Sequence, residues 1–137
     1  MVEERDNNSF LDFGLLIIRV GIGVMFMFHG WPKLLGGQQM WAGIGGAMSH
    51  IGVTFAPQVW GLLAAASEFF GGLCLVLGIF PRISTAALAF TMVIASTMHL
   101  SQGDGLQTAS HAIEAGFVFA GLFLTGPGKY RLRLSLK

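Results

Sequence analysis

The sequence is poor in charged residues. Asp, Glu, Lys and Arg make up 11% of its 137 residues, and 53% are hydrophobic, whereas about 25% of residues are charged in a typical soluble domain. So few charges exclude the surface of a water-soluble protein, and the mean hydropathy of +0.67 indicates a chain in contact with the lipid bilayer. The formal net charge of +1 argues against a nucleic-acid partner.

Cysteine is scarce as well, because Cys74 is the only one in the chain. A single cysteine excludes an internal disulfide and a metal cluster held by thiolates, and Cys74 is expected to pack as a small apolar side chain. No nucleotide-binding glycine motif occurs among the 20 glycines, which we expect to be helix-packing positions. The acidic start of the chain lacks the basic region of a signal peptide, so the first apolar stretch is expected to remain as a span.

Four apolar stretches are long enough to cross a bilayer, since about 20 helical residues span a hydrocarbon core of about 30 Å. We expect spans at about residues 11–29, 57–80, 83–100 and 108–125. Glycine and proline at Gly30–Lys33 are expected to end the first span, and a short interfacial helix should follow it. The prediction is an all-α, integral membrane four-helix bundle that forms one domain over residues 1–137.

Basic residues predict the orientation of these spans. An even number of spans places both termini and the link between the second and third spans on one side of the membrane. That side carries Arg5, Arg82, Lys129, Arg131, Arg133 and Lys137, and the other side carries Lys33. The positive-inside rule therefore predicts cytoplasmic termini in a bacterial inner membrane.

Two charged residues fall near the middle of spans, Arg19 in the first and Glu68 in the second. A lone charge at that depth costs about 3 kcal/mol. Small residues share a helical face with Glu68, which predicts that its carboxylate points into the bundle. Because their expected depths are equal, we predict that Arg19 and Glu68 form an ion pair. The pair could only fix helix packing, or Glu68 could handle protons in a site.

Histidines gather at the expected outer ends of the spans. His29, His99 and His111 stand at the ends of three different spans, and Glu114 lies one helical turn from His111. These side chains could converge at the outer mouth of the bundle. They could bind a quinone or a small polar substrate beside an apolar cavity, or merely satisfy backbone and headgroup atoms. The residue types would also allow a metal site, but no spacing typical of metal ligands fixes one, so no metal ligand is assigned, and no feature supports haem between His29 and His99.

Several short motifs, taken together, point to a known family. They are His29-Gly30-Trp31-Pro32-Lys33, Glu68-Phe69-Phe70-Gly71-Gly72 with Gly78, Arg82, His99, and Gly126-Pro127-Gly128-Lys129-Tyr130. In this order and spacing they resemble the DoxX family of small four-span bacterial and archaeal membrane proteins. The resemblance covers nearly the whole chain, although Arg131 and Arg133 stand where small and acidic residues are common in the family.

The resemblance implies a relation to the small subunits of archaeal thiosulfate:quinone oxidoreductase and to membrane redox complexes that handle thiols. Our leading hypothesis is a redox-associated subunit of a quinone-linked oxidoreductase with a partner protein in the membrane. Its site near the outer leaflet would use His99, His111, Glu114, Glu68, His29 and Arg19.

The wider family also includes factors that assist the maturation of periplasmic enzymes. The alternative is therefore a non-catalytic membrane partner or assembly factor. A small transporter is disfavoured, because the sequence shows no repeat and no interrupted span. A homo-oligomer remains open, since glycines lie on faces of the first and fourth spans, at Gly14, Gly21, Gly116 and Gly121.

Overall fold

The computed structural model describes residues 2–132, with side chains from residue 8 onward. Six α-helices, one 3-10 helix and one π-helical turn follow one another along this part of the chain. They are α1 (Val2–Leu35), α2 (Gly37–Gly45), the 3-10 helix η1 (Gly46–Ile51), α3 (Pro57–Ala66), the π-helical turn η2 (Ser67–Gly71), α4 (Gly72–Leu77), α5 (Pro81–Gln102) and α6 (Gly105–Thr125). The predicted all-α architecture is confirmed.

Four helical segments are long and apolar enough to cross a membrane. They are Asn8–Leu35, Pro57–Leu77, Pro81–Gln102 and Gly105–Thr125. The second of them joins α3, η2 and α4, and the predicted short helix between the first two spans is present as α2 and η1. The protein is therefore an integral membrane helical bundle whose apolar outer surface contacts lipid.

The expected end of the first span at Gly30–Lys33 is wrong, because α1 continues through Pro32 to Leu35. A proline inside a helix removes one backbone hydrogen bond and crowds the carbonyl four residues earlier, and two contacts stabilise the last turn of α1 against this penalty. The indole N–H of Trp41 donates to the carbonyl of Lys33 at 2.9 Å, which satisfies one of the free carbonyls at the helix end. Gly30 packs directly on the second span, and a Cβ there would lie 2.9 Å from Phe69 Cα.

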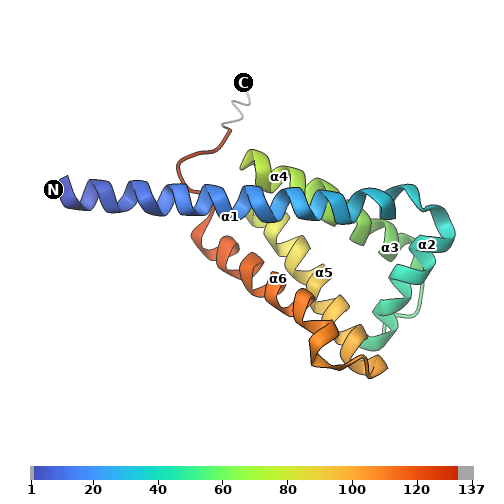
Figure 1. Cartoon of the computed structure of the whole chain (residues 1–137). Helices are drawn as coiled ribbons and strands as arrows, with labels where there is room; N and C mark the ends of the chain where they lie inside the picture. The colour runs from blue at the N-terminus through green and yellow to red at the C-terminus, as the bar shows by residue number, and fades with distance from the viewer. Residues whose placement is uncertain (1, 133–137) are drawn as a thin grey trace.

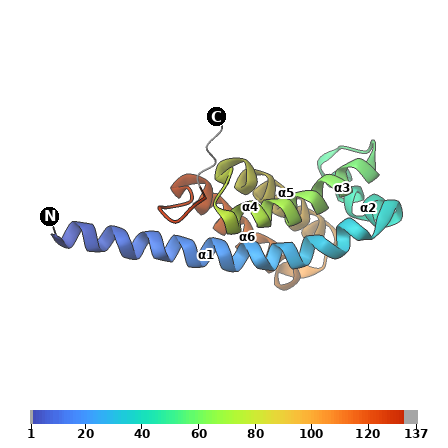
Figure 2. The same ribbon diagram turned by 90° about the horizontal axis from the view of Figure 1, so that it is seen from above.

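The helices are splayed at one end of the bundle. In Figure 1, α1 runs the length of the molecule, and the α5–α6 hairpin diverges from it toward the C-terminal end of α1. There α2 packs on α3, and η1 packs on α5. Figure 2 shows that the N-terminal part of α1 extends beyond the other helices. The splayed end carries His29, His99 and His111, and we call it the histidine end. Residues 126–132 cross the opposite end, which we call the tail end.

The core lies where all four spans meet. Its buried apolar side chains are Phe26, Leu75, Leu88, Met92, Ala112, Ala115, Phe119 and Leu122. A smaller cluster of Ala47, Met48 and Ile94 joins η1 to α5. The backbones of the first and second spans also meet at Gly23, where a Cβ would lie 2.7 Å from the carbonyl oxygen of Gly72. Only glycine permits this backbone contact.

Candidate functional site

An ion pair joins the first and second spans near the histidine end. The Lys33 ammonium lies 2.8 Å from Glu68 Oε1 and 2.7 Å from Oε2. The two side chains are 34% and 5% exposed, respectively. Side chains of an α-helix lean toward its N-terminus, so Lys33, in the last turn of α1, reaches back into the bundle toward Glu68. The expectation that Glu68 points into the bundle is confirmed.

The backbone around Glu68 is unusual. Glu68 lies in the π-helical turn η2, between α3 and α4, and π-helical turns often mark functional positions within helices. Gly30 of α1 packs against the backbone of Phe69 in this turn. The carboxylate is thus held on a fixed backbone, whereas its partner Lys33 has a long, partly exposed side chain.

The predicted ion pair between Arg19 and Glu68 is wrong. Arg19 is buried, but its guanidinium donates to the backbone carbonyls of Pro127, at 2.8 Å, and of Tyr130. Because α1 extends past Pro32, Lys33 is close enough to Glu68 to pair with it. Carbonyl oxygens of the segment after α6 bind the two terminal nitrogens of Arg19 instead, and its Nε has no hydrogen-bond partner among the described residues. Arg19 therefore anchors residues 126–132 across the tail end and lies outside the candidate site.

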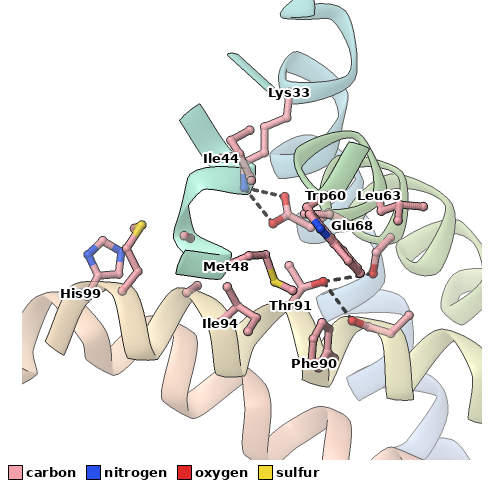
Figure 3. A pocket seen from close by; sticks show the side chains of 17 residues that line it. Lys33, Ile44, Met48, Trp60, Leu63, Glu68, Phe90, Thr91, Ile94 and His99 are labelled. Atoms are coloured by element: carbon pink, nitrogen blue, oxygen red, sulfur yellow. Dashed lines mark hydrogen bonds and ion pairs between the residues drawn. The ribbon is translucent and has the colours of Figure 1, made fainter. Parts of the chain in front are cut away.

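A cavity of about 420 Å³ lies beside the Lys33–Glu68 pair, within the range of about 300–1,000 Å³ typical of small-molecule sites. We call it the large cavity. Apolar side chains form most of its wall, among them Met48, Leu63 and Ile94. Figure 3 shows the ion pair on one side of this space and α5, with Thr91 and Ile94, on the other.

The polar atoms of the large cavity are few. Thr91 Oγ1 donates to the carbonyl of Ala87 at 2.9 Å and lies 3.4 Å from Ser67 Oγ. The indole N–H of Trp60, which also lines the cavity, is buried without a hydrogen-bond partner among the described residues. A buried donor without a partner costs about 1–3 kcal/mol.

A second, smaller cavity of about 160 Å³ lies on the other side of the ion pair. His29, His99 and His111 line this small cavity, so the structure brings these three predicted site residues together with Glu68. The ring centroids of His29 and His111 are 5.6 Å apart. Lys33, Glu68, Ala95 and His99 line both cavities. The ion pair thus stands between an apolar cavity and one with histidine walls.

His99 has a further partner toward the end of the bundle. Its Nδ1 lies 2.8 Å from the Asp104 carboxylate, in the link between α5 and α6. Glu114 is exposed and is absent from the lining of both cavities. In the part of the chain that the structure describes, no group of three or more His, Cys, Asp and Glu side chains is placed to hold a metal ion.

Sequence reasoning missed Lys33, Trp60 and Asp104 as parts of this region. A signal for Lys33 was available, because it is the only basic residue expected on its side of the membrane and directly follows an apolar span. The assumption that Pro32 ends the helix placed Lys33 in a loop. Nothing in the sequence distinguishes Trp60 from the other tryptophans at span ends.

Comparisons with known proteins agree with the fold. The DoxX family model matches residues 14–100. The chain belongs to the DoxX family. Every residue that lines the large cavity falls inside the matched range, whereas Thr108, His111 and Ala112 of the small cavity lie beyond it.

A named relative supports the same assignment. The chain is similar to the inner membrane protein YqjF of Escherichia coli K12, with 30% identity over 126 residues that cover 88% of this chain and 90% of the relative. No solved structure matches this DoxX-family protein.

Proposed function

We propose that this DoxX-family protein binds a quinone in the large cavity and acts as a redox-associated subunit of a quinone-linked oxidoreductase. The observation that carries the proposal is the Lys33–Glu68 ion pair, which lies in the wall of an apolar, ligand-sized cavity within the spans. Ionisable side chains inside membrane spans are rare and usually mark binding or proton-transfer sites. Here both charged groups border space that a ligand can fill.

The chemistry of a quinone suits the walls of the large cavity. Its ring has apolar faces and two carbonyl oxygens, which accept hydrogen bonds. The Lys33 ammonium, which has a third N–H besides the two directed at Glu68, is a donor in this wall. The Glu68 carboxylate can accept a hydrogen bond from a hydroxyl group of the reduced quinol. Met48 and Ile94 supply apolar contacts to the ring.

The proposed redox step is the reduction of the bound quinone to a quinol. A quinone that becomes a quinol takes up two electrons and two protons, with one O–H bond formed at each ring oxygen. The electrons come from a partner redox protein in the membrane complex. For each O–H bond, the Glu68 carboxylate first takes up a proton through the small cavity past His99 and His111 and then transfers it to a ring oxygen. These residues form a short polar path between the ligand and the histidine end.

The proposed setting is a bacterial inner membrane, with both termini in the cytoplasm. The relative named above is an inner membrane protein, and basic residues concentrate at the tail end. The histidine end then faces the periplasm. Self-association is compatible with this setting, because a Cβ at Gly14 or Gly21 would meet no neighbouring atom within 4 Å.

Retention of quinone through purification tests the proposal. The wild type, Glu68→Gln and Glu114→Gln are extracted from quinone-containing membranes in a mild detergent, and bound quinone is quantified by mass spectrometry. We expect retention by the wild type and by Glu114→Gln, whose carboxylate is exposed outside both cavities. Glu68→Gln should retain about tenfold less, which corresponds to about 1.4 kcal/mol.

A titration with a short, water-soluble quinone provides an independent readout. Quinones quench tryptophan fluorescence on contact, and Trp60 lines the large cavity. Saturable quenching should occur in the wild type and should be largely lost in Trp60→Phe. A wild type that neither retains quinone nor shows saturable quenching would refute the proposal. If that protein were still required for the stability of a partner enzyme, the assembly-factor alternative would be supported.

A further inference from the structure

A third hollow lies between the second span and α5. It is an open groove of about 400 Å³, lined by Ala66, Ser67, Phe70, Gly71, Cys74, Phe80, Ile83, Ser84 and Ala87. All of these side chains except the two serines are apolar, and the Ser84 hydroxyl donates to the carbonyl of Phe80 at 2.9 Å. The wall therefore suits a hydrocarbon and offers little to a polar group.

The groove continues from the large cavity. Ser67 and Ala87 line both spaces. From there the groove follows the second span to Cys74 and α5 back to Phe80. Seven residue steps separate Ser67 from Cys74 on the second span and Ala87 from Phe80, the N-cap of α5, which corresponds to about 10 Å at a rise of 1.5 Å per residue.

The groove is large enough for a hydrocarbon chain. Its volume of about 400 Å³ extends over about 10 Å along the two helices. Over this length the apolar wall offers a hydrocarbon chain van der Waals contacts.

The groove also opens toward the bilayer. Ile83, in its wall, is 72% exposed, and Phe70 and Phe80 are each 55% exposed. At the adjoining edge of the large cavity, Leu63 and Phe90 are exposed as well. Exposed apolar side chains on membrane spans face lipid. A lipid-soluble ligand can therefore enter sideways without crossing the polar histidine end.

We propose that the groove holds the hydrocarbon tail of the same molecule whose ring lies in the large cavity. The ligand is then a membrane-resident amphiphile with a polar ring and a long apolar tail, and the inference rests on the proposed quinone site for the ring. The ring lies beside Lys33 and Glu68, and the tail passes Ser67 and Ala87 toward Cys74. The ring and the tail are thus bound by two different parts of the fold.

Two quinones with the same ring test this inference, one without a tail and one with a decyl tail. Binding is measured by Trp60 quenching in lipid nanodiscs, for the wild type, Cys74→Phe and Cys74→Ser. Cys74→Phe should fill the groove and weaken the tailed quinone about tenfold, which is about 1.4 kcal/mol, because the tail loses its van der Waals contacts. The tailless quinone should bind within about twofold of wild type to all three proteins, and Cys74→Ser should bind both quinones normally.

Alkylation of Cys74 in the unmodified protein gives a second measurement that needs no substitution. The tailed quinone should slow the reaction of this thiol with membrane-permeant N-ethylmaleimide, and the tailless quinone should not. If both quinones bind but Cys74 is alkylated at an unchanged rate, the tail lies elsewhere and only this inference is overturned. Protection of Cys74 could instead depend on the phospholipid content of the nanodisc and not on the tailed quinone. That result would assign the groove to phospholipid and would also overturn this inference. If neither quinone binds the wild type, both proposals fail.

Discussion

Removal of either member of the Lys33–Glu68 pair should destabilise the protein, and the two losses should be unequal. Lys33→Met leaves the Glu68 carboxylate, with a side chain 5% exposed, as an unpaired buried charge. Breaking a buried ion pair in this way costs about 3–5 kcal/mol. Glu68→Gln leaves an ammonium whose side chain is 34% exposed. That group can move toward the headgroups, so we expect a loss of about 1–2 kcal/mol.

The double variant Lys33→Met/Glu68→Gln separates pairing from packing. It removes both charges, so its loss should be smaller than the sum of the two single losses by about 1–3 kcal/mol. Unfolding in detergent micelles, followed by circular dichroism against denaturant, measures all three variants on one scale. Arg19→Gln combined with Glu68→Gln is the control, and its losses should add. Additive losses for Lys33 and Glu68, or non-additive losses for Arg19 and Glu68, would refute the assignment of the pair.

Three further predictions concern topology, packing and the pair itself. In a cysteine-free background, Asp104→Cys should react with a membrane-impermeant thiol reagent in intact cells and Lys129→Cys should not; the reverse would place the histidine end in the cytoplasm. Gly23→Leu should destabilise by about 1–3 kcal/mol by overpacking, as measured by denaturant unfolding. Gly21→Leu, at a position with no neighbour within 4 Å, should not. Lys33→Arg should retain most of the stability but weaken quinone binding in the quenching titration. The reason is that a bidentate guanidinium holds Glu68 more rigidly than a compact ammonium does. Unchanged affinity would show that Lys33 is not a donor to the ring.

The fold was predictable because length and apolarity alone decide whether a helix can cross a bilayer. A second span is expected at residues 57–80 and is observed at Pro57–Leu77, even though it contains a π-helical turn, since the turn leaves its hydropathy unchanged. The end of α1 was not predictable by the same rule. Pro32 is an ordinary signal for a helix end, and only the tertiary contacts of Gly30 and Trp41 show why the helix continues.

The candidate site was predictable in part. Positions at span ends indicated that His29, His99 and His111 share a level, and the structure places all three around one cavity. The partner of Glu68 was not predictable. Depth estimated from residue counts is coarse compared with the reach of Arg and Lys side chains, so it does not distinguish Arg19 from Lys33 as the partner. Depth also contains no information about rotation around the helix axis. Glu114 lies one turn from His111, but its position around the helix axis leaves its side chain exposed on the outside of the bundle.

The two ends of the bundle differ in ways that bear on ligand exchange. At the tail end, Arg19 binds the carbonyls of Pro127 and Tyr130, and the Lys129 amide donates to Asp12 at 2.9 Å. These bonds hold the segment after α6 across the converging helices. At the other end, α2 and η1 pack on α3 and α5 where the hairpin diverges from α1 (Figure 1). The two cavities that border the ion pair therefore form where the helices diverge. In the proposed function this asymmetry admits the ring from the bilayer and leaves the histidine-lined cavity as its route for protons.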